Sequence, residues 1–269
     1  MNTLASENMK QSERRIYLIK FLLSEHKEHQ NIIIPKNTEE QKILLRSLMN
    51  IREAKPICDE FLVIQNEYLK SEIQAKGIID YRDTEYIGDG IYLWKGDITT
   101  LKCDAIVNAA NSGMLGCFYP NHHCIDNAIH TYAGVQLRQE CNRLMTAQGH
   151  SEKTGTAKIT KAYNLPCKYV IHTVGPITSG TATKRNTELL QSSYLSCLRL
   201  AEEHKLESIA FCCISTGEFL FPNKKAADTA ISTVQEYKKY NKHIEVIFNV
   251  FKDEDYKIYR EILTKHKPT

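Results

Sequence analysis

The chain has 269 residues, of which 42% are hydrophobic and 25% charged, and its formal net charge is +3. This is the composition of an ordinary globular protein with a core of useful size, and no run of about 18 apolar residues predicts a transmembrane helix or a membrane partner. The mild positive charge does not require a nucleic-acid partner, although it suits a small anionic ligand.

Nine cysteines occur, an odd number, and most are scattered singly along the chain. This usage argues against a disulfide framework and for a reduced, intracellular compartment, so we expect a cytoplasmic protein. Residues 1–15 are polar and lack the apolar centre of a signal peptide.

Residues 1–85 are predicted to form a helical N-terminal extension. Apolar residues recur at helical spacing from Ile16 to Leu23, and Asn37 followed by Glu40 is typical of a helix start. The same periodicity continues through Phe61 and Leu69. We therefore expect three amphipathic helices and find no chemistry in them.

Residues 86–269 are predicted to form a second unit, in which short β-rich runs alternate with helical patterns. Strands are expected at 91–94, 105–107, 169–174, 208–214 and 244–248. Helices are expected near 124–147, 186–204, 222–240 and 253–266. This alternation predicts a mostly parallel, buried sheet flanked by helices, with ligands beyond the carboxyl ends of the strands.

The segment 116–126 contains two cysteines, two histidines and an aspartate just before a helical pattern. Thiolate and imidazole are the ligands that zinc prefers. Cys117, His122 and Cys124 supply three tetrahedral positions and leave one open, as in catalytic zinc sites.

Ligand chemistry alone leaves other interpretations of this segment open. The two cysteines are also explained as small buried thiols beside a surface histidine. A structural zinc is the intermediate interpretation, with Cys103 or His130 as the fourth ligand. His123, which follows His122 directly, is the alternative histidine ligand.

Several motifs, in the same order along the chain, resemble those of macrodomains, the ADP-ribose-binding α/β/α family. They are GDIT at 96–99, DAIVNAANS at 104–112, AIH at 128–130 with AG at 133–134, YVIHTVGP at 169–176 and ISTG at 214–217. The resemblance covers roughly residues 88–252. It implies a three-layer α/β/α fold with a mixed, mostly parallel sheet, preceded here by the helical extension.

The chain departs from most macrodomains in one place, because residues 116–124 replace their glycine-rich phosphate loop. The Cys-x4-His-x-Cys spacing and the helical extension resemble the zinc-dependent macrodomains often encoded beside a sirtuin-like ADP-ribosyltransferase. This resemblance implies a Zn²⁺ cofactor and a hydrolase that removes ADP-ribose from modified proteins, mainly at Asp or Glu side chains. In some operons the target resembles a lipoyl-carrier protein of the glycine-cleavage H type.

The resemblance assigns Asp126 and Asn108 to catalysis. Asp126 would orient water or the distal ribose, and Asn108 and Asn111 would present their amides to that ribose. The alternative explanations are a first-turn aspartate at a helix start and asparagines that favour strand-to-loop corners. His130, one turn after Asp126, is expected to have a packing and hydrogen-bonding role.

The remaining substrate-binding residues follow from two further motifs. Asp97 resembles the carboxylate that accepts a hydrogen bond from the adenine amino group, with Ile98 beside it, although a turn aspartate after Gly96 is the alternative. The diphosphate loop is expected at Ser215, Thr216, Gly217, Glu218 and Phe219. Either Phe219 or Phe221 would contact a ribose or the adenine, and the other would belong to the core.

The sequence leaves the role of zinc open between lowering the pKa of a bound water and binding the distal ribose. The competing hypothesis is a non-catalytic reader that binds ADP-ribose and uses zinc to brace a loop. A nucleic-acid-binding macrodomain is disfavoured by the modest charge and the lack of a basic-aromatic stripe.

Overall fold

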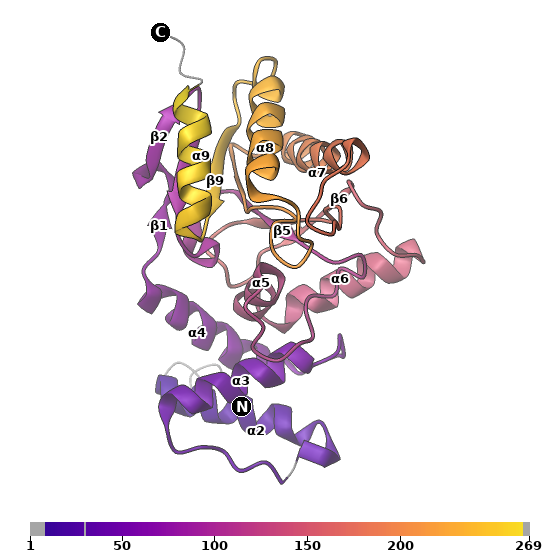
Figure 1. Ribbon diagram of the computed structural model, residues 1–269. Helices are drawn as coiled ribbons and strands as arrows, with labels where there is room; N and C mark the ends of the chain where they lie inside the picture. The colour runs from indigo at the N-terminus through magenta and orange to yellow at the C-terminus, as the bar shows by residue number, and fades with distance from the viewer. Residues whose placement is uncertain (1–8, 30, 266–269) are drawn as a thin grey trace.

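The structure is a computed structural model that describes residues 9–29 and 31–265 (Figure 1). The first eight residues of the predicted extension, and residue 266 of the predicted last helix, lie outside the described residues. The extension contains the three expected helices, α2 (Gln11–Ser24), α3 (Thr38–Ile51) and α4 (Asp59–Lys76). The last of them ends ahead of the boundary expected near residue 85, and a short strand, β1 (Ile79–Asp80), follows.

The predicted helix start at Asn37 is confirmed. Its side-chain Oδ1 accepts hydrogen bonds from the backbone N–H groups of Glu39, at 2.8 Å, and Glu40, at 3.2 Å. These bonds satisfy two of the N–H groups that have no partner inside helix α3.

Replacing Asn37 with alanine is expected to lower the free energy of unfolding by about 1 kcal/mol, because the α3 terminus loses its cap. Urea unfolding of Asn37→Ala beside the wild type measures the change. An unchanged midpoint would show that the cap contributes nothing to the stability of the extension.

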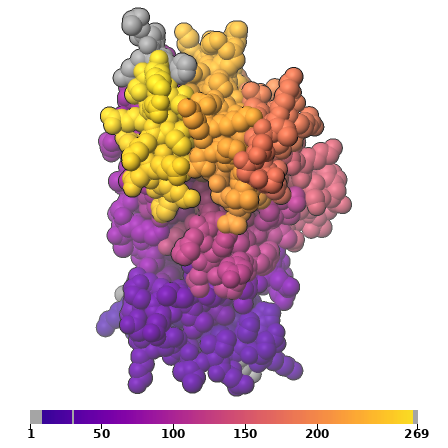
Figure 2. Space-filling model, viewed as in Figure 1, coloured from indigo at the N-terminus to yellow at the C-terminus, as the bar shows by residue number. Residues whose placement is uncertain are grey.

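The three extension helices share a hydrophobic cluster of their own. Its members come from α2, α3 and α4 and include Leu18, Ile19, Leu45 and Phe61, with Val135 added from the helix Val135–Gln148. Figure 2 shows the indigo extension gathered at one end of the molecule and packed against the rest. The predicted amphipathic periodicity therefore buries one face of each helix in a shared cluster, with α3 and α4 both packed on α2.

The described part of the second unit contains a seven-stranded sheet in the order β2-β3-β9-β8-β5-β7-β6. The four central strands, from β3 to β5, are mutually parallel, and β7 joins them in parallel. The strands are β2 (Glu85–Gly88), β3 (Ile91–Lys95), β5 (Ala105–Ala109), β6 (Ala157–Lys161), β7 (Tyr169–Thr173), β8 (Ser208–Phe211) and β9 (Glu245–Val250). A second, two-stranded sheet pairs β1 with β4 (Leu101–Lys102).

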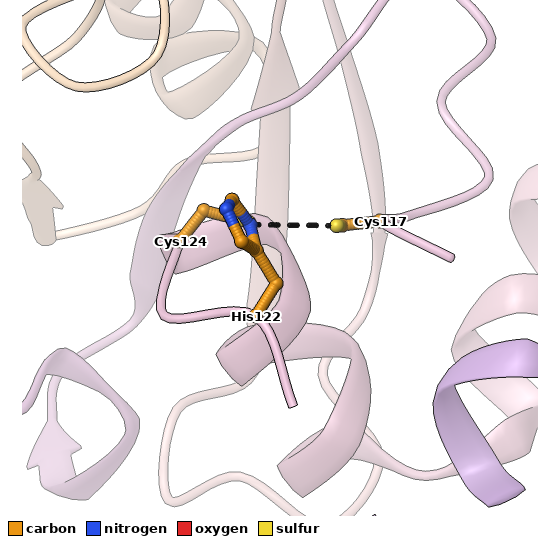
Figure 3. Close-up of side chains that lie close together, drawn as sticks. All are labelled: Cys117, His122 and Cys124. Atoms are coloured by element: carbon orange, nitrogen blue, oxygen red, sulfur yellow. Dashed lines mark hydrogen bonds between the residues drawn. The ribbon is translucent and has the colours of Figure 1, made fainter. Parts of the chain in front are cut away.

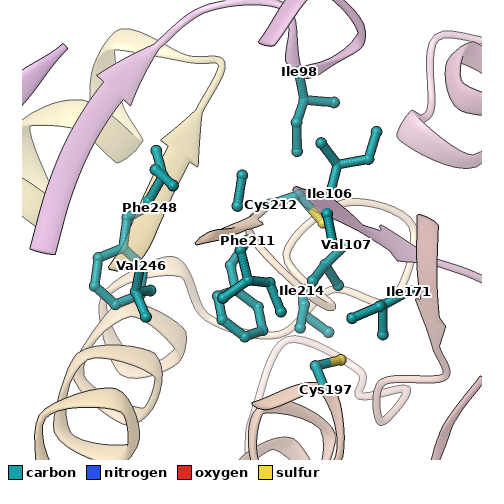
Figure 4. Close-up of a cluster of buried hydrophobic side chains, with 14 of the residues drawn as sticks. Ile98, Ile106, Val107, Ile171, Cys197, Phe211, Cys212, Ile214, Val246 and Phe248 are labelled. Carbon is teal, nitrogen blue, oxygen red and sulfur yellow. The ribbon is translucent and has the colours of Figure 1, made fainter. Parts of the chain in front are cut away.

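Helices cover both faces of the large sheet, which gives the expected three layers. Figure 1 shows α7, α8 and α9 on one side and α5 and α6 on the other. The helices are α5 (Ile125–Ala133), α6 (Val135–Gln148), α7 (Lys184–Glu203), α8 (Asn223–Lys238) and α9 (Asp253–Lys265), with short 3-10 helices at Lys27–His29, Tyr81–Asp83 and Ile98–Thr100. The strands bury aliphatic and aromatic side chains between these layers, among them Ile106, Val107, Phe211 and Phe248 (Figure 4).

The sequence prediction missed three features of this unit, namely the edge strands β2 and β6 and a break in one helix. The two edge strands pair antiparallel with β3 and β7, so the sheet is mixed and mostly parallel, as the resemblance implied. The helix expected over 124–147 is two helices, because Gly134 separates α5 from α6 with a φ of +95°. A Cβ at this position would lie 2.6 Å from the Gln65 side chain, so only glycine fits the break.

Among the described residues, no helix is long and apolar enough to cross a membrane.

Candidate active site

A cleft of about 890 Å³ lies beyond the carboxyl ends of the parallel strands. Its lining comes from the segments that follow β3, β5 and β8, from the end of β9, and from the loop before α5. This is the edge of the sheet at which ligands were expected. The lining includes these predicted site residues: Asp97, Ile98, Asn111, Cys117, His122, Cys124, Asp126, Ser215, Thr216, Gly217, Glu218 and Phe219.

Asp97 occupies one end of the cleft and makes both turn contacts and an ion pair. Its Oδ1 accepts from the backbone N–H of Thr99 at 3.0 Å and from the Thr99 hydroxyl at 2.6 Å. Its Oδ2 lies 2.8 Å from Nζ of Lys76, which comes from α4. Burial opposes ionisation, but the hydrogen bonds from Lys76 and Thr99 prevail and hold the pKa of Asp97 below its ordinary value. The carboxylate is therefore charged and can accept a further donor.

The segment Ser215 to Phe219 forms the wall of the cleft after β8. Ser215 has a φ of +67°, and its buried hydroxyl has no hydrogen-bond partner among the described residues. A Cβ on Gly217 would meet nothing within 4 Å, so its backbone faces open space. In the described part of the chain the N–H groups of residues 217–219 donate to no protein acceptor. Consecutive free N–H groups of this kind bind anions.

The expected choice between two phenylalanines is resolved by their burial. Phe219 is half-buried and lines the cleft, whereas Phe221 is 1% exposed and belongs to the core. Phe251, just after β9, adds an exposed aromatic ring to the same lining.

Asp126 lies in the first turn of α5 and is 5% exposed. Asn108 Nδ2 donates to its Oδ1 at 2.8 Å, and Asn111 Nδ2 donates to its Oδ2 at 3.2 Å. Burial raises the pKa of Asp126 to about 6, although both asparagine bonds favour the charged form. The two strand-end amides therefore fix the direction of a buried carboxyl at the edge of the cleft.

Asn108 itself is fully buried behind Asp126. Its Nδ2 also lies 3.1 Å from Nδ1 of His172, so both amide hydrogens have partners, and its Oδ1 has none among the described residues. Burial lowers the pKa of His172 to about 3, so this ring is neutral.

His130 fits the packing part of its expected role. It is 5% exposed, with its Nε2 3.6 Å from Asp126 Oδ1, but neither ring nitrogen makes a hydrogen bond within the described residues. Burial holds the pKa of His130 well below its ordinary value, so this ring is also neutral.

The three predicted metal ligands converge at the other end of the cleft (Figure 3). Their ligand atoms all lie within 4.8 Å of one another, and Cys117 Sγ is 3.6 Å from His122 Nδ1. Atoms bound to one tetrahedral zinc at about 2.0–2.3 Å are separated by about 3.3–3.8 Å, and the Cys117–His122 pair has this separation. Neither His123 nor the proposed fourth ligands Cys103 and His130 belong to this group of the described residues.

The second ring nitrogen of the candidate ligand His122 faces the predicted diphosphate loop. His122 Nε2 lies 3.6 Å from Oε1 of Glu218, which is otherwise exposed. Carboxylates commonly occupy this position next to metal-binding histidines, where they orient the ring. Glu218 therefore faces the metal ligands as well as the cleft.

The sequence interpretation missed the contribution of the extension. Arg46 of α3 and Lys76 of α4 both line the cleft, and Lys76 Nζ also lies 3.5 Å from the ring centroid of Tyr132. Nothing in the helical periodicity distinguishes these cations from solvent-exposed ones. Only the packing of the extension against α5 brings them to the site.

The chain is similar to several proteins of known family. The Macro domain family matches residues 107–230. A protein-ADP-ribose hydrolase of Treponema medium is 55% identical over 261 residues, covering 95% of this chain and 100% of the relative. One of Staphylococcus aureus strain MSSA476 is 48% identical over 263 residues, covering 96% and 98%.

Solved structures show the same fold. An Oceanobacillus iheyensis macrodomain with ADP has a TM-score of 0.62 at 35% identity, covering 67% of this chain and 94% of that chain. A Trypanosoma brucei macrodomain in complex with ADP-ribose has a TM-score of 0.63 at 27% identity, covering 81% and 94%. By its fold, the order of its motifs and these relatives, the chain belongs to the Macro domain family.

Proposed function

We propose that the protein is a hydrolase that removes ADP-ribose from ADP-ribosylated proteins. The observation that carries this proposal is the position of Asp126. Its carboxyl is buried, oriented by Asn108 and Asn111, and placed in the same cleft as Cys117 and the other candidate metal ligands. The activity named for relatives that match nearly the whole chain supports it.

We propose that ADP-ribose binds along the cleft in a single orientation, with its adenine at Asp97 and its distal ribose at Asp126. The charged carboxylate of Asp97 accepts from the adenine amino group, and Phe219 or Phe251 contacts the nucleoside. The free N–H groups of residues 217–219 bind the diphosphate. The distal ribose then lies beside Asn111 and Asp126, with its C1 towards the metal ligands.

The scissile bond joins C1 of the distal ribose to a protein side chain. Asp126 orients the attacking water or the ribose hydroxyls, and Asn108 and Asn111 hold the carboxyl in place, so little reorganisation is needed during the reaction. Hydrolysis of glycosidic bonds commonly uses two carboxyl groups. Among the described residues, Asp126 is the buried carboxyl beside the candidate metal ligands. We infer that a metal takes the role of the second carboxyl group.

We propose Zn²⁺ as this metal, held by Cys117, His122 and Cys124. Bound there, zinc supplies a Lewis acid at the scissile end of the cleft. The donor set supports zinc, because two thiolates and one imidazole are ligands it prefers. The linkage proposed is the ester to Asp or Glu, which is the easiest to cleave.

The cellular setting is proposed on the resemblance to sirtuin-linked macrodomains. The target would be a lipoyl-carrier protein of the glycine-cleavage H type in the cytoplasm, modified by a sirtuin-like transferase. We further propose that residues 86–269 form the macrodomain and residues 1–85 the extension.

Replacing Asp97 with alanine is expected to weaken ADP-ribose binding by about 1–3 kcal/mol, because the adenine amino group loses a buried acceptor. Isothermal titration calorimetry measures this change. Asp80→Ala is the matched control, since Asp80 also caps a 3-10 helix and pairs with a cation, Arg82, outside the cleft lining. Equal affinities of Asp97→Ala and wild type would remove Asp97 from the adenine site.

The proposed function is tested by incubating the purified protein with a lipoyl-carrier protein whose acidic residues bear labelled ADP-ribose. We expect release of free ADP-ribose, and we expect a chelator to abolish the release and added zinc to restore it. Tight binding of ADP-ribose without release from any linkage would instead identify a reader.

A further inference from the structure

The metal ligands lie on a segment that has no helix or strand of its own. Residues 117–124, here called the metal loop, join the strand-end segment after β5 to helix α5. Within the loop one backbone bond is present, from His122 N–H to Tyr119 O at 3.2 Å. A loop with so little internal bonding needs other elements to hold three ligand atoms in one geometry.

Helix α3 of the extension provides direct contacts to the metal loop. Arg46 donates from a terminal guanidinium nitrogen to the backbone oxygen of His122 at 3.0 Å. Asn50 Oδ1, buried at 1% exposure, accepts from the backbone N–H of Asn121 at 2.9 Å. Asn121 Nδ2 donates to the Ser47 hydroxyl at 2.5 Å. Residues 46, 47 and 50 of α3 therefore bind two neighbouring loop residues, Asn121 and His122.

Arg46 also acts on the loop through Asn127 of α5. Two guanidinium nitrogens of Arg46 lie 2.8 and 3.2 Å from Asn127 Oδ1. Because arginine only donates hydrogen bonds, the oxygen of this buried amide must face Arg46 and its nitrogen must face away. That nitrogen donates to Tyr119 O at 3.0 Å and to Cys117 O at 3.5 Å.

Asn127 also reaches the third ligand. Its backbone N–H donates to Cys124 Sγ at 3.4 Å. The contacts of Arg46 and Asn127 thus touch all three ligand residues: the carbonyl groups of Cys117 and His122, and the sulfur of Cys124.

We propose that Arg46 and Asn50 are positioning residues for the metal site, so that helix α3 of the extension is a working part of that site. This inference rests on the proposed metal site. Residues that hold metal ligands from outside typically change metal affinity by about 10–100-fold when they are removed. Helix α3 therefore prepares the loop for the metal, while the loops at the strand ends bind the nucleotide.

The test compares Arg46→Met with wild type in the full-length protein. Methionine keeps the apolar stem and removes the donors. Lys42→Met is the matched control, because it removes a cation one turn earlier on α3 whose partners, Glu39 and Glu72, both belong to the extension. Asn50→Ala is the second variant, and thermal unfolding of metal-free protein reports whether each variant folds.

Three measurements distinguish positioning from a general loss of structure. Zinc affinity is measured by competition with a chromophoric chelator, the ligand geometry by the visible spectrum of the Co²⁺-substituted protein, and ADP-ribose affinity by calorimetry. In Arg46→Met and Asn50→Ala we expect zinc affinity about 10–100-fold lower, an altered Co²⁺ spectrum and ADP-ribose affinity within about threefold of wild type. Lys42→Met is expected to match wild type, and Arg46→Lys to recover part of the loss.

Each contrary outcome has a defined meaning. Unchanged zinc affinity and Co²⁺ spectrum in both variants would overturn this inference and leave the proposed function standing. A fall in ADP-ribose affinity with unchanged zinc affinity would show that Arg46 binds the nucleotide instead, and would also overturn it. Absence of zinc from wild type would overturn the proposed metal site together with this inference.

Discussion

Replacing Cys117 with alanine is expected to remove zinc from the protein and to slow single-turnover release of ADP-ribose by about two to three powers of ten. The reason is that two remaining ligands cannot hold the ion, and a Lewis acid at the scissile bond contributes several kcal/mol to the transition state. The fold should survive, because Cys117 is only half-buried, on a loop outside the sheet.

Metal content by elemental analysis and the release rate measured on the same samples check this result. Cys58→Ala is the control for loss of a thiol, since Cys58 is exposed in the extension.

A second pair of variants tests which histidine binds the metal: His122→Ala is expected to lose the metal and His123→Ala to keep it. A zinc-free Cys117→Ala that hydrolyses at the wild-type rate would show that the metal is structural.

Replacing Asn108 with alanine is expected to reduce the single-turnover rate about a hundredfold while changing ADP-ribose affinity less than about tenfold. Asn108 Nδ2 donates to Asp126 Oδ1 at 2.8 Å, and loss of this hydrogen bond lets the proposed catalytic carboxyl move. A displacement of about 1 Å typically lowers the rate by about a hundredfold. The affinity is maintained by the distant adenine and diphosphate contacts, so the change falls on turnover rather than on binding.

The control for Asn108 is another buried amide. Asn164 Nδ2 donates to Asn66 Oδ1 and Ala133 O, both at 2.9 Å, and Asn164 lies outside the cleft lining. Asn164→Ala should lower stability without affecting the release rate. An equal loss of rate in both variants would attribute the Asn108 effect to general destabilisation.

The central strands could be predicted from sequence because they are mostly buried and contain adjacent β-branched residues, as in β5 and β7. The edge strands could not, because β6 has two lysines among five mostly half-buried residues and β2 has no buried residue. The Gly134 break was also missed, since a glycine between two amphipathic runs does not reveal that the Gln65 side chain will occupy its Cβ position.

The candidate site was predictable where adjacent residues carry the chemistry. Cys117, His122 and Cys124 are close in sequence, so one short loop brings them together, and their sulfur and nitrogen donors favour zinc. Arg46 and Lys76 could not be identified, because each reaches the cleft across a long sequence separation that only the packing of the extension sets. Local patterns contain no information about such contacts.

The measurement that most directly tests the central claim is the single-turnover rate of ADP-ribose release from a protein modified on acidic residues. This rate and the affinity for free ADP-ribose are both measured for the enzyme with and without zinc. The account predicts fast release by the zinc-loaded protein, release slower by about a hundredfold or more after metal removal, and nearly equal ADP-ribose affinities in the two forms. Binding of ADP-ribose with no release by the zinc-loaded protein would contradict it.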